Sequence, residues 1–170
     1  MKTQLYLLLF LATQFVFAQE TENKIQELPT EYGAYTIPLW TKLTLELKET
    51  SKNKFEYRII SSEPYEEMYS FDKHDKVFSE NPKKNTVDIL FVGAYYNNGK
   101  EDSDYKTLLK IRNNLDIPLT YKADIKYYFN NEFENTSIVG AFPGTDTQEI
   151  WAHKIDLIAL YDFEILNSKE

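Results

Sequence analysis

The sequence predicts an all-β protein, and within that class an immunoglobulin-like two-sheet β-sandwich of about eight strands. Three observations support this prediction. Apolar and polar residues alternate over several stretches of strand length, turn-forming residues separate these stretches by roughly 8–12 residues, and no stretch after residue 18 has a sustained helical period. Uneven connections, and strands that are apolar on both faces, favour the sandwich over a lipocalin-like β-barrel, which remains the alternative.

Residues 1–18 are predicted to form a secretory signal peptide. Lys2 precedes an apolar run from Leu5 to Phe17, and the small Ala18 stands before a polar stretch that begins at Gln19. The run is shorter than the roughly 20 apolar residues of a membrane-spanning helix. We therefore expect cleavage after Ala18 and no integral membrane segment in the mature chain. The end of the run resembles bacterial signal peptides, which implies export to the periplasm, the cell surface or the medium.

The mature chain begins with a polar segment, residues 19–34, which has no sustained period; we expect one domain over residues 35–167. Residues 39–48 alternate strictly between apolar and polar side chains and predict a strand with one wet face. A turn at 49–54 and a second alternating stretch at 55–60 complete a predicted hairpin.

The middle of the chain is less regular. Residues 61–84 contain prolines and many charges, so we expect a long loop with one short strand near 67–71. Residues 86–96 are apolar on both faces, which predicts a central strand covered on both sides. Residues 97–104 are rich in Asn and Asp and contain an Asn-Gly dipeptide, so they predict a loop.

Residues 105–129 predict a second β-hairpin, because two alternating arms flank a turn-rich connector at 112–118. In the second arm, the face that begins with Leu119 and ends with Phe129 is apolar and is expected to face the core. The opposite face of the hairpin should show its lysines to solvent: Lys106, Lys110, Lys122 and Lys126.

Three shorter signals close the chain. Residues 133–139 and 148–153 predict strands, and the Gly- and Pro-containing stretch 140–144 predicts a turn between them. Residues 155–165 predict a final strand whose second face is half apolar. This strand and the one at 86–96 are therefore expected at the centres of the sheets.

Composition excludes several classes of protein. The chain has no cysteine, so neither disulfides nor a lipid-bearing cysteine can stabilise or anchor it. Its net charge is −8 and its basic residues are interspersed with acids, which argues against a nucleic-acid partner. The 13 tyrosines and 11 phenylalanines supply the large side chains that a core needs.

The sequence carries no catalytic signature. It has no cysteine nucleophile, no Gly-x-Ser-x-Gly elbow and no Gly-rich phosphate loop. Carboxylates are too numerous, at 27, for any pair to be diagnostic. We therefore expect no enzyme and no cofactor. A metal-dependent hydrolase that uses Asp72, His74 and Asp75 is kept as an alternative.

Two kinds of binding residue can be named. Asp102 and Asp104 lie in an oxygen-rich loop that could hold calcium, although the spacing is not that of an EF-hand. Trp40 and Tyr128 fall on polar-patterned strand faces, and Tyr95 and Tyr96 end a strand, so these aromatic residues are candidates for contact with a partner.

The function that fits these observations is a non-catalytic, exported binding module for a protein or a glycan. Two alternatives to this function are the hydrolase described above and a carrier that holds a small ligand inside a β-barrel.

Overall fold

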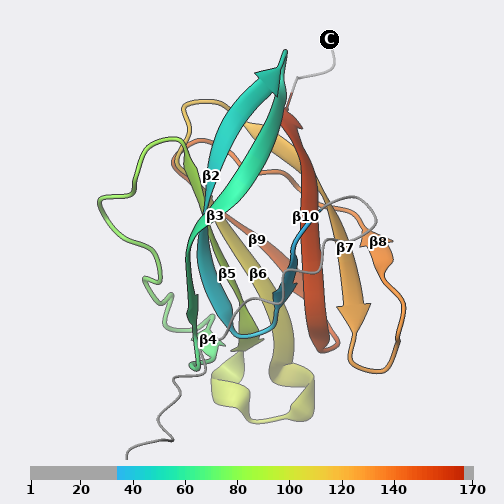
Figure 1. Cartoon of the computed structure of the whole chain (residues 1–170). Helices are drawn as coiled ribbons and strands as arrows, with labels where there is room; N and C mark the ends of the chain where they lie inside the picture. Colours follow the sequence, from blue (N-terminus) through green and yellow to red (C-terminus); the bar gives the residue numbers. More distant parts are fainter. Residues whose placement is uncertain (1–33, 167–170) are drawn as a thin grey trace, which may run out of the picture.

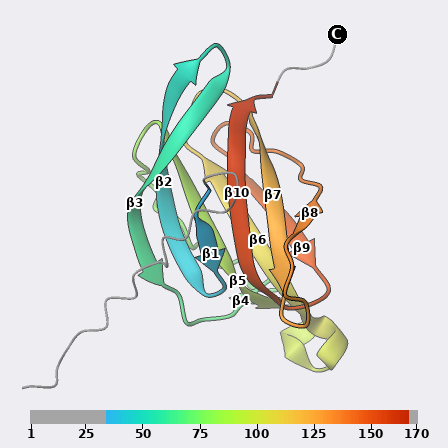
Figure 2. The ribbon, with the colours of Figure 1, turned by 45° about the vertical axis from the view of Figure 1, so that its right-hand side comes forward.

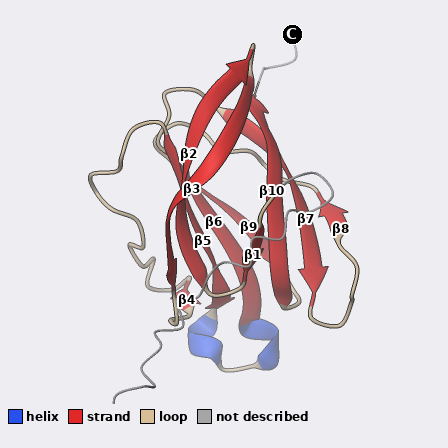
Figure 3. Ribbon diagram, viewed as in Figure 1, coloured by secondary structure: helices blue, strands red, loops and turns tan. Residues whose placement is uncertain are grey.

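The computed structural model describes residues 34–166, whose strands form one curled, almost entirely antiparallel sheet (Figure 1). The elements are β1 (Thr36–Pro38), β2 (Thr41–Ser51), β3 (Lys54–Pro64), β4 (Tyr69–Ser70), β5 (Thr86–Tyr95), the 3₁₀ turns η1 (Asn97–Gly99) and η2 (Asp102–Asp104), β6 (Tyr105–Asn113), β7 (Leu119–Tyr127), β8 (Glu134–Thr136), β9 (Asp146–Trp151) and β10 (Ile155–Ile165). The all-β prediction is confirmed: these residues contain no α-helix, and the segments drawn in blue in Figure 3 are the two 3₁₀ turns. Nor does this part of the chain contain a helix long and apolar enough to span a membrane.

The strands follow the order β8-β7-β10-β3-β2-β5-β6-β9, with β1 added beside β10 and β4 added in parallel beside β5. Hydrogen bonds thus run through the whole set without a break into two sheets. The predicted two-sheet sandwich is not confirmed, and a sheet curled into a half-barrel is compatible with the barrel alternative. Figure 2 shows β10 and β7 side by side with β1 next to them.

A corner between β1 and β2 helps the sheet to curl. β1 pairs with β10, and the amide of the next residue, Leu39, still donates to the carbonyl of Asp156 at 2.9 Å. The amide of Trp40 instead donates to the carbonyl of Phe91 on β5 at 2.8 Å. Trp40 has a φ of 70°, in the left-handed region that bulky residues rarely adopt. The chain therefore leaves β10 and joins β5 within two residues.

The concave side of the sheet holds the main apolar core. Alternation places every second residue of β2, β5, β6 and β7 on this side, as a period of two requires. In β10, two irregularities in the register change this period, and the core residues are Ile155, Ile158, Leu160 and Phe163. The largest fully buried side chains include those of Leu43, Leu45, Ile89, Phe91, Leu109, Ile111, Leu119, Ile155, Ile158 and Phe163.

A second apolar cluster covers the convex side of β5 and β6. The outward side chains Leu90, Val92 and Leu108 are fully buried, because the loop between β4 and β5 lays Val77 and Phe78 over them. Both faces of β5 are therefore covered, which confirms the prediction that this strand is central.

The predicted hairpin over residues 105–129 is correct in its strands and wrong in its pairing. β6 pairs with β5 and β9, whereas β7 pairs with β10 and β8. The connector is held in the core by Leu115, which is buried, and by Asn113, whose side-chain amide donates to the carbonyls of Ile117 and Ala141 in 2.7 and 3.0 Å. The connector thus crosses between two parts of the curled sheet and does not reverse the chain within one ladder.

The expectation that Lys110 faces solvent is also wrong. Its side chain is 8% exposed, and its ammonium group lies 3.1 Å from Asp146 and 3.3 Å from the hydroxyl of Tyr69. The reason is the loop before β5, which covers this part of the convex face. Lys122, by contrast, is exposed and pairs with Asp162 in 2.7 Å.

The remaining strand predictions agree with the structure within a few residues. The final strand has the predicted bounds, and the predicted turn at 140–144 contains two glycines with positive φ, Gly140 and Gly144. The predicted signal peptide, residues 1–18, and the polar segment up to residue 33 lie outside the described residues.

Candidate functional site: an aromatic rim at one end of the sheet

The sheet register brings aromatic residues from several strands to one end of the molecule. Tyr95 at the end of β5 is paired with Tyr105 at the start of β6, Thr107 is paired with Trp151 at the end of β9, and Ile155 at the start of β10 is paired with Tyr127. This is the lower end of the molecule in Figure 1. We call six of the exposed or half-exposed aromatic residues at this end the aromatic rim: Tyr95, Tyr105, Tyr127, Tyr128, Phe129 and His153.

The most exposed part of the rim follows β7. Tyr128 and Phe129 are 59% and 61% exposed, with their ring centroids 5.0 Å apart in an edge-to-face arrangement. Tyr127 stacks on Phe129 with centroids 5.1 Å apart, and the His153 ring meets Phe129 edge-on at 5.9 Å. Such contacts between rings hold them in place while leaving a large apolar surface in water.

The other half of the rim is connected to this cluster through the turn between β9 and β10. The hydroxyl of Thr107 on β6 donates to the carbonyl of His153 in 3.0 Å. Near Thr107 on the same strand, Tyr105 is 43% exposed and its ring lies 6.4 Å from that of Tyr95. The rim is therefore held by both backbone pairing and side-chain contacts.

Tyr96 has a different role from its neighbour. Its ring stacks on Phe71 with centroids 4.1 Å apart and an interplanar angle of 10°, and it is half-buried. The amide of Phe71 donates to the carbonyl of Tyr95 in 3.1 Å. Tyr96 therefore holds the loop after β4 against the end of β5.

Trp40 is 36% exposed and packs over Gly93 of β5. A Cβ atom at position 93 would lie 2.7 Å from the Cη2 atom of Trp40, so the absence of a side chain there makes room for the indole. Most of the Trp40 side chain thus serves packing, and a smaller part is open to contact.

The two aspartates predicted for calcium have unequal surroundings. Asp104 is 8% exposed, and its carboxylate accepts hydrogen bonds from the Asn97 side-chain amide in 3.1 Å and from the Glu101 amide in 3.0 Å. The Asn97 bond, followed by the Glu101 bond, lowers the pKa of this carboxyl group. Asp104 therefore caps its own loop, whereas Asp102 is exposed.

No group of three or more His, Asp or Glu side chains converges anywhere within residues 34–166. Calcium binding at Asp102 and Asp104 stays a prediction of the sequence alone. The alternative hydrolase site is dispersed: Asp72 accepts from the Asn98 amide in 2.9 Å, Asp75 accepts from the Ser70 amide in 3.3 Å, and His74 is exposed in a turn.

The sequence reading missed Phe129 and His153. Phe129 continues the apolar face of the strand that begins at Leu119, and this alternation assigned it to the core. β7 ends at Tyr127, however, so Phe129 lies beyond the sheet that would have covered it. Its position just before a polar Asn-Asn-Glu stretch was the available signal that the strand ends there.

Comparison with protein-family models, with curated proteins and with solved structures finds no match for this chain.

Proposed function

We propose that the protein is an exported, non-catalytic binding module whose aromatic rim docks a partner protein. The observation that carries the proposal is the exposure of Tyr128 and Phe129, at 59% and 61%, within a cluster of rings that already contact one another. Aromatic residues are enriched in protein interfaces, and rings held by their neighbours lose little conformational entropy on binding.

A protein partner is favoured over a glycan by the mixed character of the exposed apolar surface. Beyond the rim, the chain exposes Phe133, the aliphatic Val139 at 62% and Ile150 at 41%. The amide of Val139 donates to the Glu149 carboxylate in 2.6 Å, which keeps this connection close to β9 and Ile150. These aliphatic side chains lie outside the rings of the rim, and a protein interface is large enough to bury them together with the rings.

The double variant Tyr128→Ala with Phe129→Ala tests this proposal. The matched control is Phe142→Ala, which removes a ring of 44% exposure in the turn at the other end of the sheet. We expect the double variant to lose capture of a partner from a solubilised envelope fraction, and the control to retain it. Both should keep the melting temperature of the unmodified protein, because exposed side chains contribute little to stability.

Two arms of the same experiment identify the class of partner. Protease treatment of the envelope fraction should abolish capture, while periodate oxidation of its glycans should leave capture unchanged. The opposite result would replace the protein partner by a glycan. Equal capture by the double variant and the unmodified protein would show that the aromatic rim is not the binding surface.

A further inference from the structure

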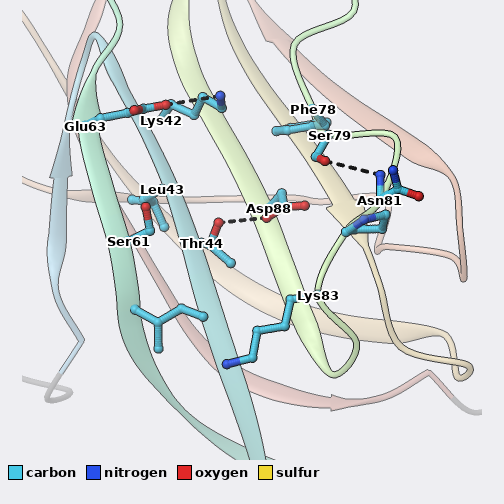
Figure 4. Close-up of a pocket in the computed structure, with 12 residues that line it drawn as sticks. Lys42, Leu43, Thr44, Ser61, Glu63, Phe78, Ser79, Asn81, Lys83 and Asp88 are labelled. Carbon is cyan, nitrogen blue, oxygen red and sulfur yellow. Dashed lines mark hydrogen bonds and ion pairs between the residues drawn. The ribbon is translucent and has the colours of Figure 1, made fainter.

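A groove on the convex face of the sheet forms a second candidate binding site, separate from the aromatic rim. It has a volume of about 290 Å³ and lies between the outward faces of β2, β3 and β5 and the loop of residues 78–83 (Figure 4). This volume is just below the usual range of small-molecule sites, about 300–1,000 Å³, so the ligand must be small.

The loop that forms one wall of the groove is held at several points. Phe78 is buried under the guanidinium group of Arg112, which lies 5.4 Å from the ring centroid and donates to the carbonyl of Ser79 in 3.1 Å. At the other end of the loop, the carbonyl of Lys83 accepts a hydrogen bond of 2.5 Å from the hydroxyl of Thr86. The groove is therefore formed before any ligand arrives, which lowers the entropic cost of binding.

The floor of the groove contains an oriented carboxylate. One oxygen of Asp88 accepts from the hydroxyl of Thr44 in 2.7 Å, and the other accepts from the side-chain amide of Asn114 in 2.8 Å. A carboxylate has about four lone-pair positions, so each oxygen can accept one more hydrogen bond. A ligand that donates from neighbouring hydroxyl groups would use these positions.

Four charged side chains line the groove, and all of them except Asp88 form ion pairs. Lys42 lies 3.1 Å from Glu63 across β2 and β3, and Lys83 lies 2.8 Å from Glu46. An anionic ligand would be repelled by Asp88, and a cationic ligand would be repelled by Lys42 and Lys83. A neutral polar ligand would leave the ion pairs intact.

Uncommitted hydrogen-bonding groups complete the lining. Within residues 34–166, neither the hydroxyl of Ser61 nor the side-chain amide of Asn81 has a hydrogen-bond partner. Ile60, which is 37% exposed, adds an apolar surface beside them. Donors, acceptors and one apolar patch around a small volume match the hydroxyl groups and the C–H face of a single sugar ring.

We propose that this groove binds a neutral monosaccharide unit, with Asp88 accepting from adjacent hydroxyl groups, Ser61 and Asn81 bonding to others, and Ile60 covering a C–H face. The proposal does not depend on the aromatic rim, because no rim residue lines the groove.

The test is a titration of ¹⁵N-labelled protein with glucose, galactose and N-acetylglucosamine, followed by the amide signals of Thr44, Ser61 and Asp88. Glucuronate and glucosamine serve as the charged comparisons. At least one neutral sugar should shift these signals saturably, and its charged counterparts should bind more weakly. No saturable shift with any neutral sugar, or tighter binding of a charged one, would overturn the proposal.

Two filling variants and one control locate the site. Ser61→Phe fills the groove from β3, Asn81→Phe fills it from the loop, and both should lose the saturable shifts. Ser62→Phe is the control, since Ser62 is paired with Leu43 and therefore lies on the opposite face of β3. Shifts that persist in both folded filling variants would place the sugar elsewhere. The Tyr128→Ala, Phe129→Ala variant should keep the shifts, so this proposal and the rim proposal fail separately.

Discussion

Replacing Trp40 by glycine should harm the protein less than replacing it by alanine. This order reverses the usual one, since glycine normally destabilises a β-strand relative to alanine by about 0.5–1 kcal/mol. The reason is the backbone of residue 40, whose φ of 70° is needed for the chain to pass from β10 to β5.

The size of the effect follows from packing and backbone strain. Removing a fully buried aromatic side chain costs about 3–5 kcal/mol, and Trp40 is 36% exposed, so both variants should lose about 2–3 kcal/mol of packing over Gly93. Alanine keeps a left-handed strain of about 1–2 kcal/mol, which glycine does not have. The larger conformational entropy of glycine in the unfolded chain offsets part of this difference in the free energy of unfolding. The glycine variant should therefore be more stable by about 0.5–1 kcal/mol.

Urea unfolding followed by far-ultraviolet circular dichroism measures the free energy of unfolding of both variants. Tyr128→Ala is the control, and it should change stability by no more than about 0.5 kcal/mol because this ring is exposed. A glycine variant less stable than the alanine variant would refute the left-handed corner. An alanine variant as stable as the unmodified protein would refute the packing of Trp40 on Gly93.

Three further predictions concern charged side chains. Asp146→Asn should lower the free energy of unfolding by about 1–3 kcal/mol, because the buried Lys110 ammonium group loses its carboxylate; adding Lys110→Met should restore part of the loss in the same urea assay. Burial raises the pKa of Glu149, so the charged carboxylate lowers the stability of the folded protein at neutral pH, whereas the protonated group does not. Glu149→Gln should therefore raise the melting temperature at pH 7. This gain should vanish as the pH falls below the ordinary carboxyl pKa of 4.5. The pKa of Asp104 is lowered in the folded protein, so its carboxylate stabilises the fold above the ordinary pKa of 3.8, and this stabilisation is lost as the pH falls through the lower folded pKa. Hydrogen exchange at the Glu101 amide, which donates to Asp104, should therefore show an acid-dependent step. Asp104→Asn should remove this step.

The strands and their inward faces could be predicted from the sequence because the period of two is a local property. In β7, Leu119, Tyr121, Ala123 and Ile125 are all buried, as their alternation with polar residues predicted. β5 and β10 were recognisable as covered strands because apolar residues occupy both of their faces. Turn residues also marked most strand ends to within a few positions.

The candidate site was predictable only in part. Tyr128 was predicted to be exposed because it falls on the wet face of an alternating stretch. It is 59% exposed, although β7 ends one residue before it. Trp40 was identified by the same rule, but its packing over Gly93 depends on a contact between residues that lie far apart in the sequence. The groove combines residues from three strands and a loop, so no single stretch of sequence predicts it.

The sequence by itself thus determined the all-β class, the strand positions and, in regular strands such as β2 and β7, the side that faces the core, since these depend on neighbouring residues. The irregular register of β10 changes which of its residues reach the core. Tertiary structure alone decided that β6 and β7 pair with other strands, that Lys110 is buried, and that aromatic residues from four strand ends form one rim. The physical reason is that alternation shows which face of a strand must be buried, but it does not show which other strand or loop buries that face. That choice is made by contacts across the curled sheet, where Leu115 fills the core beneath the connector and the loop before β5 covers the convex face.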